Sequence, residues 1–122
     1  MASGAEKRTR ALVRERSGGI CELGIPGVCL GAATNISHRQ AKGQGGPWTA
    51  ANCMDSCGSG TTGCHGWVEA NPIEAASRGL RIASFVHESR ISRAPVQMRT
   101  TQWPPDQYLL HEDGTITPCH FG

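Results

Sequence analysis

The most informative part of the sequence is AANCMDSCGSGTTGCHGWVEANP, from Ala50 to Pro72. Its segment CMDSC (residues 53–57) predicts a short strand. The glycine-rich residues that follow predict a tight turn into a helical turn over residues 65–70. Asn71 and Pro72 then favour the start of a second helix, as a cap and a first helical residue. The stretch therefore predicts strand, turn and helix in close succession.

Four of the six cysteines form two looped pairs with 27 residues between them, namely Cys21 with Cys29 and Cys57 with Cys64. Zinc binds four thiolates tetrahedrally, and two short glycine-containing loops can each present two sulfurs. The spacing therefore favours one structural zinc ion that has no open coordination position. Disulfides and buried free thiols are the alternatives. Cys53 and Cys119 remain outside this set, and we expect Cys53 to be a buried thiol.

The rest of the chain predicts a mixture of helices and strands. Residues 5–16 have a basic helical composition, and residues 33–38 favour a strand. The glycine-rich segment 39–50 is expected to form a long loop. Residues 80–89 are apolar enough for a strand, and residues 108–119 contain an Asp-Gly turn between two β-prone runs. The expected fold class is α+β.

Length and composition predict one domain with a thin core. The chain has 122 residues, of which 38% are hydrophobic and 5% aromatic, so a metal is a plausible additional fastening. No apolar run approaches the ~18 residues of a membrane span, and the first residues lack the apolar stretch of a secretory signal. We therefore expect a cytoplasmic protein with no membrane partner and with reduced cysteines.

Charge is distributed unevenly although the net value is only +2. Residues 1–42 and 78–100 each carry a net charge of +4, whereas residues 43–77 carry −3. Two basic segments around an acidic, cysteine-rich centre are suited to gripping phosphates. Ordinary solvated faces explain the same pattern, so charge alone does not distinguish these interpretations.

Three polar residues lie within the cysteine frame: His38, Asn52 and His65. The segment SHRQAKGQGG (residues 37–46), followed by the stretch quoted above, resembles the HNH endonuclease family. The sequence looks most like small HNH proteins encoded by phages of actinobacteria, and the resemblance covers about residues 10–80. The resemblance implies a single domain over residues 1–122 with a small zinc-stapled ββα-metal (His-Me finger) core. The motif of this core spans about residues 20–80. A basic helix would precede the core, and a C-terminal β extension of unknown role would follow it over residues 81–122.

The resemblance also implies a function, the metal-dependent hydrolysis of DNA phosphodiester bonds. His38 matches the general base that activates water, and Asn52 matches the asparagine that ties the strands and the histidine loop together. His65 matches a ligand of a catalytic divalent metal such as Mg²⁺, Mn²⁺, Ni²⁺ or Zn²⁺. We expect the cysteine frame to bring His38 towards His65.

The sequence departs from the family at one metal ligand. Ser37 stands where the family has His or Asp, and a neutral hydroxyl is a poor ligand. Glu69 lies four residues after His65 and would share its helix face, so it is the candidate replacement. Asp55 is a weaker candidate.

DNA is the expected partner, and Arg39 and Lys42 are the expected phosphate contacts in the loop after His38. The phage resemblance also implies a role in DNA packaging with the terminase, in the cytoplasm of the bacterial host. A second hypothesis is a catalytically weak or inactive zinc-stapled module that binds DNA or terminase. A disulfide-rich extracellular domain is a third, weaker hypothesis.

Overall fold

The structure is a computed structural model that describes residues 2–119, and it has a mixed α+β fold. Its elements in chain order are α1 (Gly4–Ser17), β1 (Asn35–His38), the 3-10 helix η1 (Lys42–Gln44), β2 (Cys53–Ser56), α2 (Gly63–Ala70), α3 (Pro72–Ser77), the 3-10 helix η2 (Glu88–Arg93), β3 (Val96–Met98), β4 (Asp106–Leu110) and β5 (Ile116–Pro118). Within these residues, no helix combines the length and apolar character needed to cross a membrane.

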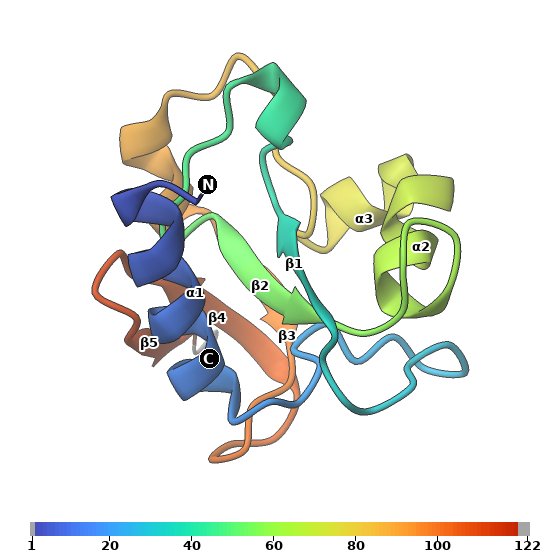
Figure 1. Cartoon of the computed structure of the whole chain (residues 1–122). Coiled ribbons are helices and arrows are strands. Elements are labelled where there is room, and N and C mark those ends of the chain that lie inside the picture. Colours follow the sequence, from blue (N-terminus) through green and yellow to red (C-terminus); the bar gives the residue numbers. More distant parts are fainter. Residues whose placement is uncertain (1, 120–122) are drawn as a thin grey trace.

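The strands form two separate antiparallel sheets. β1 pairs with β2, with His38 opposite Cys53 and Asn35 opposite Ser56. The second sheet has the order β3-β4-β5. Figure 1 shows α1 on one side of the β1–β2 sheet and α2 with α3 on the other. Alternating strand residues therefore face either α1 or α2.

The predicted N-terminal helix is confirmed, and its charged residues fasten it to the sheet. Ser3 caps the helix by accepting a hydrogen bond from the Glu6 backbone N–H at 3.0 Å. Val13 is fully buried in a cluster that includes Cys53 of β2. Arg16 forms an almost fully buried ion pair with Glu22 at 2.8 Å. Arg16 thus serves the interior of the protein, whereas the other basic residues of α1 are exposed.

The C-terminal residues complete the main core. The predicted hairpin is confirmed as β4 and β5, and β3 joins it as a third strand that the sequence did not predict. Val96 and Met98 from β3, with Tyr108 and Leu110 from β4, are buried in one cluster with the cysteines. The residues after 80 are thus an integral part of the core.

The predicted strand over residues 80–89 is wrong. Its one β contact in the described structure is an isolated bridge between Gln40 and Ile82. The Gln40 side-chain amide instead donates to the carbonyl oxygens of Ala83 and Val86 at 3.0 and 2.8 Å. These hydrogen bonds satisfy the carbonyl groups of Ala83 and Val86 without a neighbouring strand. The Phe85 side chain is 89% exposed, so the segment does not bury its apolar residues as a strand would.

Candidate metal centre and histidine site

The four predicted cysteines converge on one point. Their sulfur atoms all lie within 4.8 Å of one another, in a set formed by Cys21, Cys29, Cys57 and Cys64. A tetrahedral zinc ion with bonds of about 2.3 Å holds its sulfurs about 3.8 Å apart, so a small contraction of this cluster would fit the ion. Because each sulfur is near all three others, the arrangement suits one shared metal ion better than two separate disulfides.

Backbone N–H groups of the two cysteine loops orient the sulfurs. The Cys57 sulfur accepts hydrogen bonds from the N–H groups of Leu30 and Cys64, each at 3.2 Å. The Cys64 sulfur accepts one from Ile25 at 3.4 Å. A hydrogen bond from the Cys64 thiol lowers the pKa of Cys21 to about 4, and the same contact raises the pKa of Cys64. The donor set fits a metal ion that binds thiolates.

The tight turn between Cys57 and Cys64 requires glycine. Gly63 has a φ of 62°, and a Cβ atom there would lie 2.8 Å from the Gly58 Cα. A Cβ atom on Gly58 itself would lie only 2.1 Å from the Thr62 carbonyl oxygen. Only glycine therefore fits at these two positions, and the short turn that they form returns the chain from Cys57 to Cys64.

Cys53 is a buried thiol outside the metal centre, as predicted. It packs against Val13 and Ala50, and burial raises its pKa to about 12. A thiol of such high pKa is inert at neutral pH. Cys119 is half-buried and also lies outside the cluster.

Asn52 ties together the two ends of the loop that follows His38. Its side-chain oxygen accepts a hydrogen bond from the Gln40 N–H at 2.7 Å. Its amide nitrogen donates to the carbonyl oxygens of Gln40 and Pro47 at 3.1 and 3.0 Å. Because Asn52 is completely buried, these bonds fix the loop, which is the structural task expected of this residue.

His38 occupies a half-buried position beside Trp48. The two rings meet edge to face with centroids 4.4 Å apart. The Nε2 atom of His38 is buried and has no hydrogen-bond partner. Burial, followed by the charges of Lys42 and Arg10, lowers the pKa of His38, and Glu6 opposes this. The imidazole is therefore neutral at pH 7.

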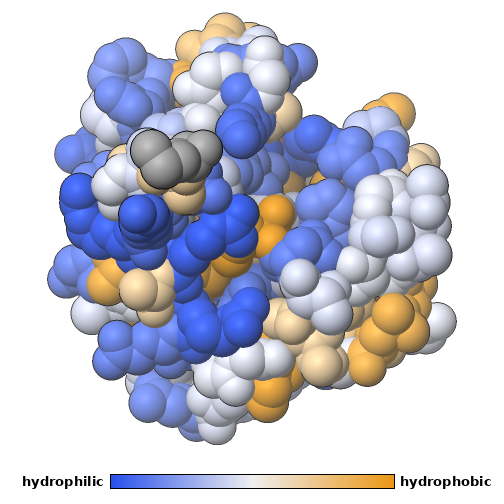
Figure 2. All heavy atoms as spheres, in the orientation of Figure 1, coloured by the Kyte–Doolittle hydropathy of each residue, from blue (hydrophilic) through white to orange (hydrophobic). Residues whose placement is uncertain are grey.

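Two cations surround this aromatic pair. The Arg10 guanidinium lies 5.1 Å and the Lys42 ammonium 5.5 Å from the Trp48 ring centroid. Arg10 also lines a hollow between α1 and β1 with Arg14 and Ile36. Figure 2 shows the hydrophilic surface over α1 and a hydrophobic spot in the hollow beside it. Ile36 and His38 share one face of β1, but His38 itself does not line the hollow.

His65 lies on the other face of the β1–β2 sheet. Its Nδ1 atom is 3.3 Å from the Ser56 hydroxyl, and Ser56 pairs with Asn35, three residues from His38. Three residues of strand span about 10 Å and end on the opposite face. The expectation that His38 and His65 converge is therefore wrong, because the two side chains lie on opposite faces of the sheet. Ser37, the neighbour of His38 in β1, lies on the same face of the sheet as His65.

The two candidate carboxylates have other partners. Glu69 forms an ion pair with Arg81 at 3.4 Å. Asp55 is fully buried, and it accepts hydrogen bonds from Arg14 at 2.8 and 3.1 Å and from Ser17. Asp55 is thus a structural counter-ion of α1. Among residues 2–119, the cysteine cluster is the one group of three or more His, Cys, Asp or Glu side chains placed to hold a metal.

The expectation that Arg39 binds phosphate requires correction. Arg39 is only 1% exposed, and burial lowers its pKa to about 10. Its guanidinium donates to the carbonyl oxygens of Gly79, Ala51 and Ala94 at 2.8, 3.0 and 2.7 Å. Arg39 therefore joins the loop to residues 79–95 in the interior. Lys42, in contrast, is exposed.

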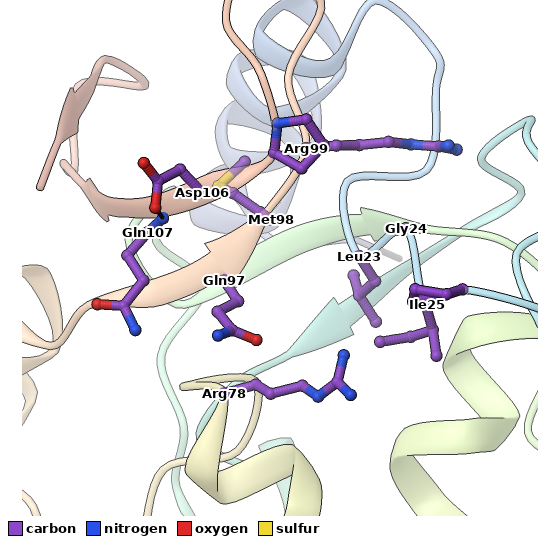
Figure 3. A pocket seen from close by; sticks show the side chains of 11 residues that line it. Leu23, Gly24, Ile25, Arg78, Gln97, Met98, Arg99, Asp106 and Gln107 are labelled. Atoms are coloured by element: carbon purple, nitrogen blue, oxygen red, sulfur yellow. Dashed lines mark hydrogen bonds between the residues drawn. The ribbon is translucent and has the colours of Figure 1, made fainter.

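Sequence reasoning missed Arg99, which follows β3 and reaches the metal centre. It donates a hydrogen bond to the Cys29 sulfur at 3.0 Å. Arg99 also lines a pocket of about 380 Å³ with Arg78 and Asp106 (Figure 3). No local pattern around Arg99 signals this contact, because the two residues are 70 positions apart.

Comparison with models of known protein families, with curated proteins and with solved structures finds no match to this chain.

Proposed function

We propose that this protein is a metal-dependent endonuclease of the HNH kind that hydrolyses DNA phosphodiester bonds, with a structural zinc ion at the four cysteines. The chain order of β1, loop, β2 and α2 supports this proposal, because it is the order expected of an HNH core. The cysteine cluster also links the parts of the chain that carry His38 and His65. Asn52 supports it further by fixing the loop directly after His38.

The state of His38 carries the proposal. A general base must be unprotonated and must have a free lone pair. The lowered pKa favours the neutral imidazole at pH 7, and its Nε2 atom is buried without a partner in the protein, so the attacking water would have to enter beside it. Arg10 and Lys42 supply positive charge beside it, which suits a phosphodiester. In this role His38 takes a proton from the water that attacks phosphorus.

His65 is the proposed ligand of the catalytic divalent ion, with Ser37 and Glu69 as further candidates. When its Nδ1–H donates to Ser56, its Nε2 atom keeps a lone pair for a metal. To bind this ion, the Glu69 carboxylate would have to break its ion pair with Arg81 or contact both Arg81 and the metal. A bound Mg²⁺, Mn²⁺, Ni²⁺ or Zn²⁺ ion would act as a Lewis acid on the phosphate. Because His38 and His65 occupy opposite faces, the substrate would have to pass over the free edge of β1.

Exposed cations favour DNA as the partner. Lys42 is the proposed phosphate contact of the loop, and Arg10 joins it from α1. Such contacts position the backbone and do not read the base sequence. The terminase is a proposed second partner, and the host cytoplasm the proposed location, because of the resemblance to phage HNH proteins.

The alternative function is a zinc-stapled module that binds DNA or terminase with little or no cleavage. The pairing of Glu69 with Arg81 favours it, as does the separation of the two histidines. In this alternative Ser37 marks a catalytic metal site that has been lost.

A plasmid-nicking assay decides between these functions. We expect nicking with Mg²⁺, Mn²⁺ or Ni²⁺, none with EDTA, and a loss of about 10²–10⁴-fold in rate for His38→Ala. His87→Ala is the matched control, because His87 is exposed in another part of the chain. Absence of nicking by the wild type with every metal would favour the binding module. Nicking by His38→Ala at the wild-type rate would remove His38 from the role of base.

A further inference from the structure

Cys29 differs from the other three cysteines of the cluster. Cys21, Cys57 and Cys64 are fully buried, whereas Cys29 is half-buried. The sulfurs of Cys57 and Cys64 are held by backbone N–H donors of the loops themselves. The Cys29 sulfur contacts the Gly31 backbone N–H and, at 4.0 Å, the Cys57 thiol, and it also accepts a hydrogen bond from a side chain that is distant in sequence, Arg99. Cys29 is thus the position at which solvent most readily reaches the metal centre.

Arg99 binds both ends of the loop that carries Cys21 and Cys29. Its Nε atom donates to the Cys21 carbonyl oxygen at 2.8 Å. Its terminal nitrogen donates to the Cys29 sulfur at 3.0 Å and approaches the Gly31 carbonyl oxygen at 3.4 Å. Figure 3 shows the side chain extending from the segment after β3 towards the loop that carries Gly24. The planar fork of a guanidinium is suited to several acceptors at once, unlike an ammonium group.

The loop is shaped to receive this side chain. A Cβ atom on Gly24 would lie 3.0 Å from the Arg99 Cδ atom, so glycine leaves space for the arginine stem. The backbone N–H of Arg99 also donates to the Glu22 carbonyl oxygen at 3.0 Å. The chain after β3 is therefore fixed to the loop through both its backbone and its side chain.

We propose that Arg99 is a positioning residue of the metal centre, which holds the half-buried Cys29 sulfur in its metal-binding place and shields it from solvent. A divalent ion bound by four thiolates carries a net charge of about −2, which a neighbouring guanidinium stabilises. Partners that hold a metal ligand in this way typically change metal affinity by about 10–100-fold. This role concerns the cysteine cluster and is independent of the nuclease activity proposed above.

Three variants of the full-length protein test this role: Arg99→Met, Arg99→Lys and the control Arg93→Met, which alters an exposed cation of η2. Each is loaded with Co²⁺, whose thiolate charge-transfer band reports on the sulfur ligands, and is then mixed with excess chelator. For Arg99→Met we expect about 10–100-fold faster metal release and a band shifted to lower energy. Arg99→Lys keeps a charge but loses the fork, so an intermediate release rate is expected.

Two results would overturn the proposal. The first is wild-type release and an unmoved band in Arg99→Met. The second is faster release with an unmoved band, which would mean that Arg99 only supports the loop and does not act on the sulfur. If Arg99→Met does not fold, the same criteria apply to Arg99→Lys.

Discussion

The sulfurs of Cys21, Cys29, Cys57 and Cys64 lie within 4.8 Å of one another, whereas His38 and His65 occupy opposite faces of the β1–β2 sheet. Both sets come from the same part of the chain. The cysteines lie in or beside turns, where backbone N–H groups direct the sulfurs inward. The face to which the His38 side chain points is set instead by the alternation of side chains along β1.

This contrast shows what residue spacing can predict. A looped cysteine pair tolerates small changes in its turns, because metal binding depends only on the final positions of the two sulfur atoms. In a strand, a shift of one residue moves a side chain to the other face. Ser37, and not its neighbour His38, therefore shares the face of His65.

The largest expected effect concerns the cysteine cluster. Cys57→Ser removes a predicted metal ligand and the sulfur that accepts two backbone N–H groups. A structural zinc ion supplies about 10–16 kcal/mol, comparable to the whole stability of about 5–15 kcal/mol of a typical protein. We expect no cooperative thermal transition by circular dichroism. Cys119→Ser, outside the cluster, should melt like the wild type, and a wild-type transition in Cys57→Ser would contradict the account.

The next effect concerns the loop that carries the histidine site. Asn52→Ala would leave the N–H and carbonyl groups of Gln40 unpaired in the interior, and the part-buried Pro47 carbonyl would keep only its 3.9 Å contact with the Cys53 thiol. Because a buried unpaired group costs about 1–3 kcal/mol, we expect a loss of roughly 3 kcal/mol or more in urea unfolding. Asn71→Ala is the control, since its side chain donates one hydrogen bond, to Trp67. Equal losses in the two variants would contradict the role of Asn52.

The smallest effect concerns charge around His38. Lys42 disfavours the protonated imidazole, so Lys42→Met should raise the pKa of His38 towards its ordinary value of about 6.5. An NMR titration of the imidazole measures this shift, with Lys7→Met as the control on α1. A pKa that stays the same or falls in Lys42→Met would show that the cation does not act on His38.

The elements that could be predicted from the sequence carry their signals locally. The N-terminal helix, the short strands around the glycine loop, and the hairpin with its Asp-Gly turn all have their caps or turn residues within a few positions. The cysteine pairs could be predicted for the same reason, since each pair closes one short loop.

The predictions that failed depend on distant partners. Arg39 is buried because its acceptors come from Gly79, Ala51 and Ala94, which no local pattern connects to it. The apolar segment over residues 80–89 lacks a neighbouring strand and is held by the side chain of Gln40, which follows β1. Arg99 follows β3 of the second sheet and contacts Cys29, from which it is 70 positions away in the chain.

X-ray absorption at the zinc edge of the natively purified protein tests whether the four cysteines bind one metal ion. We expect one zinc ion per chain and a first shell of four sulfur atoms at about 2.3 Å. A first shell that contains nitrogen or oxygen, or protein that folds without any bound metal, would contradict the claim that these four cysteines form one metal centre.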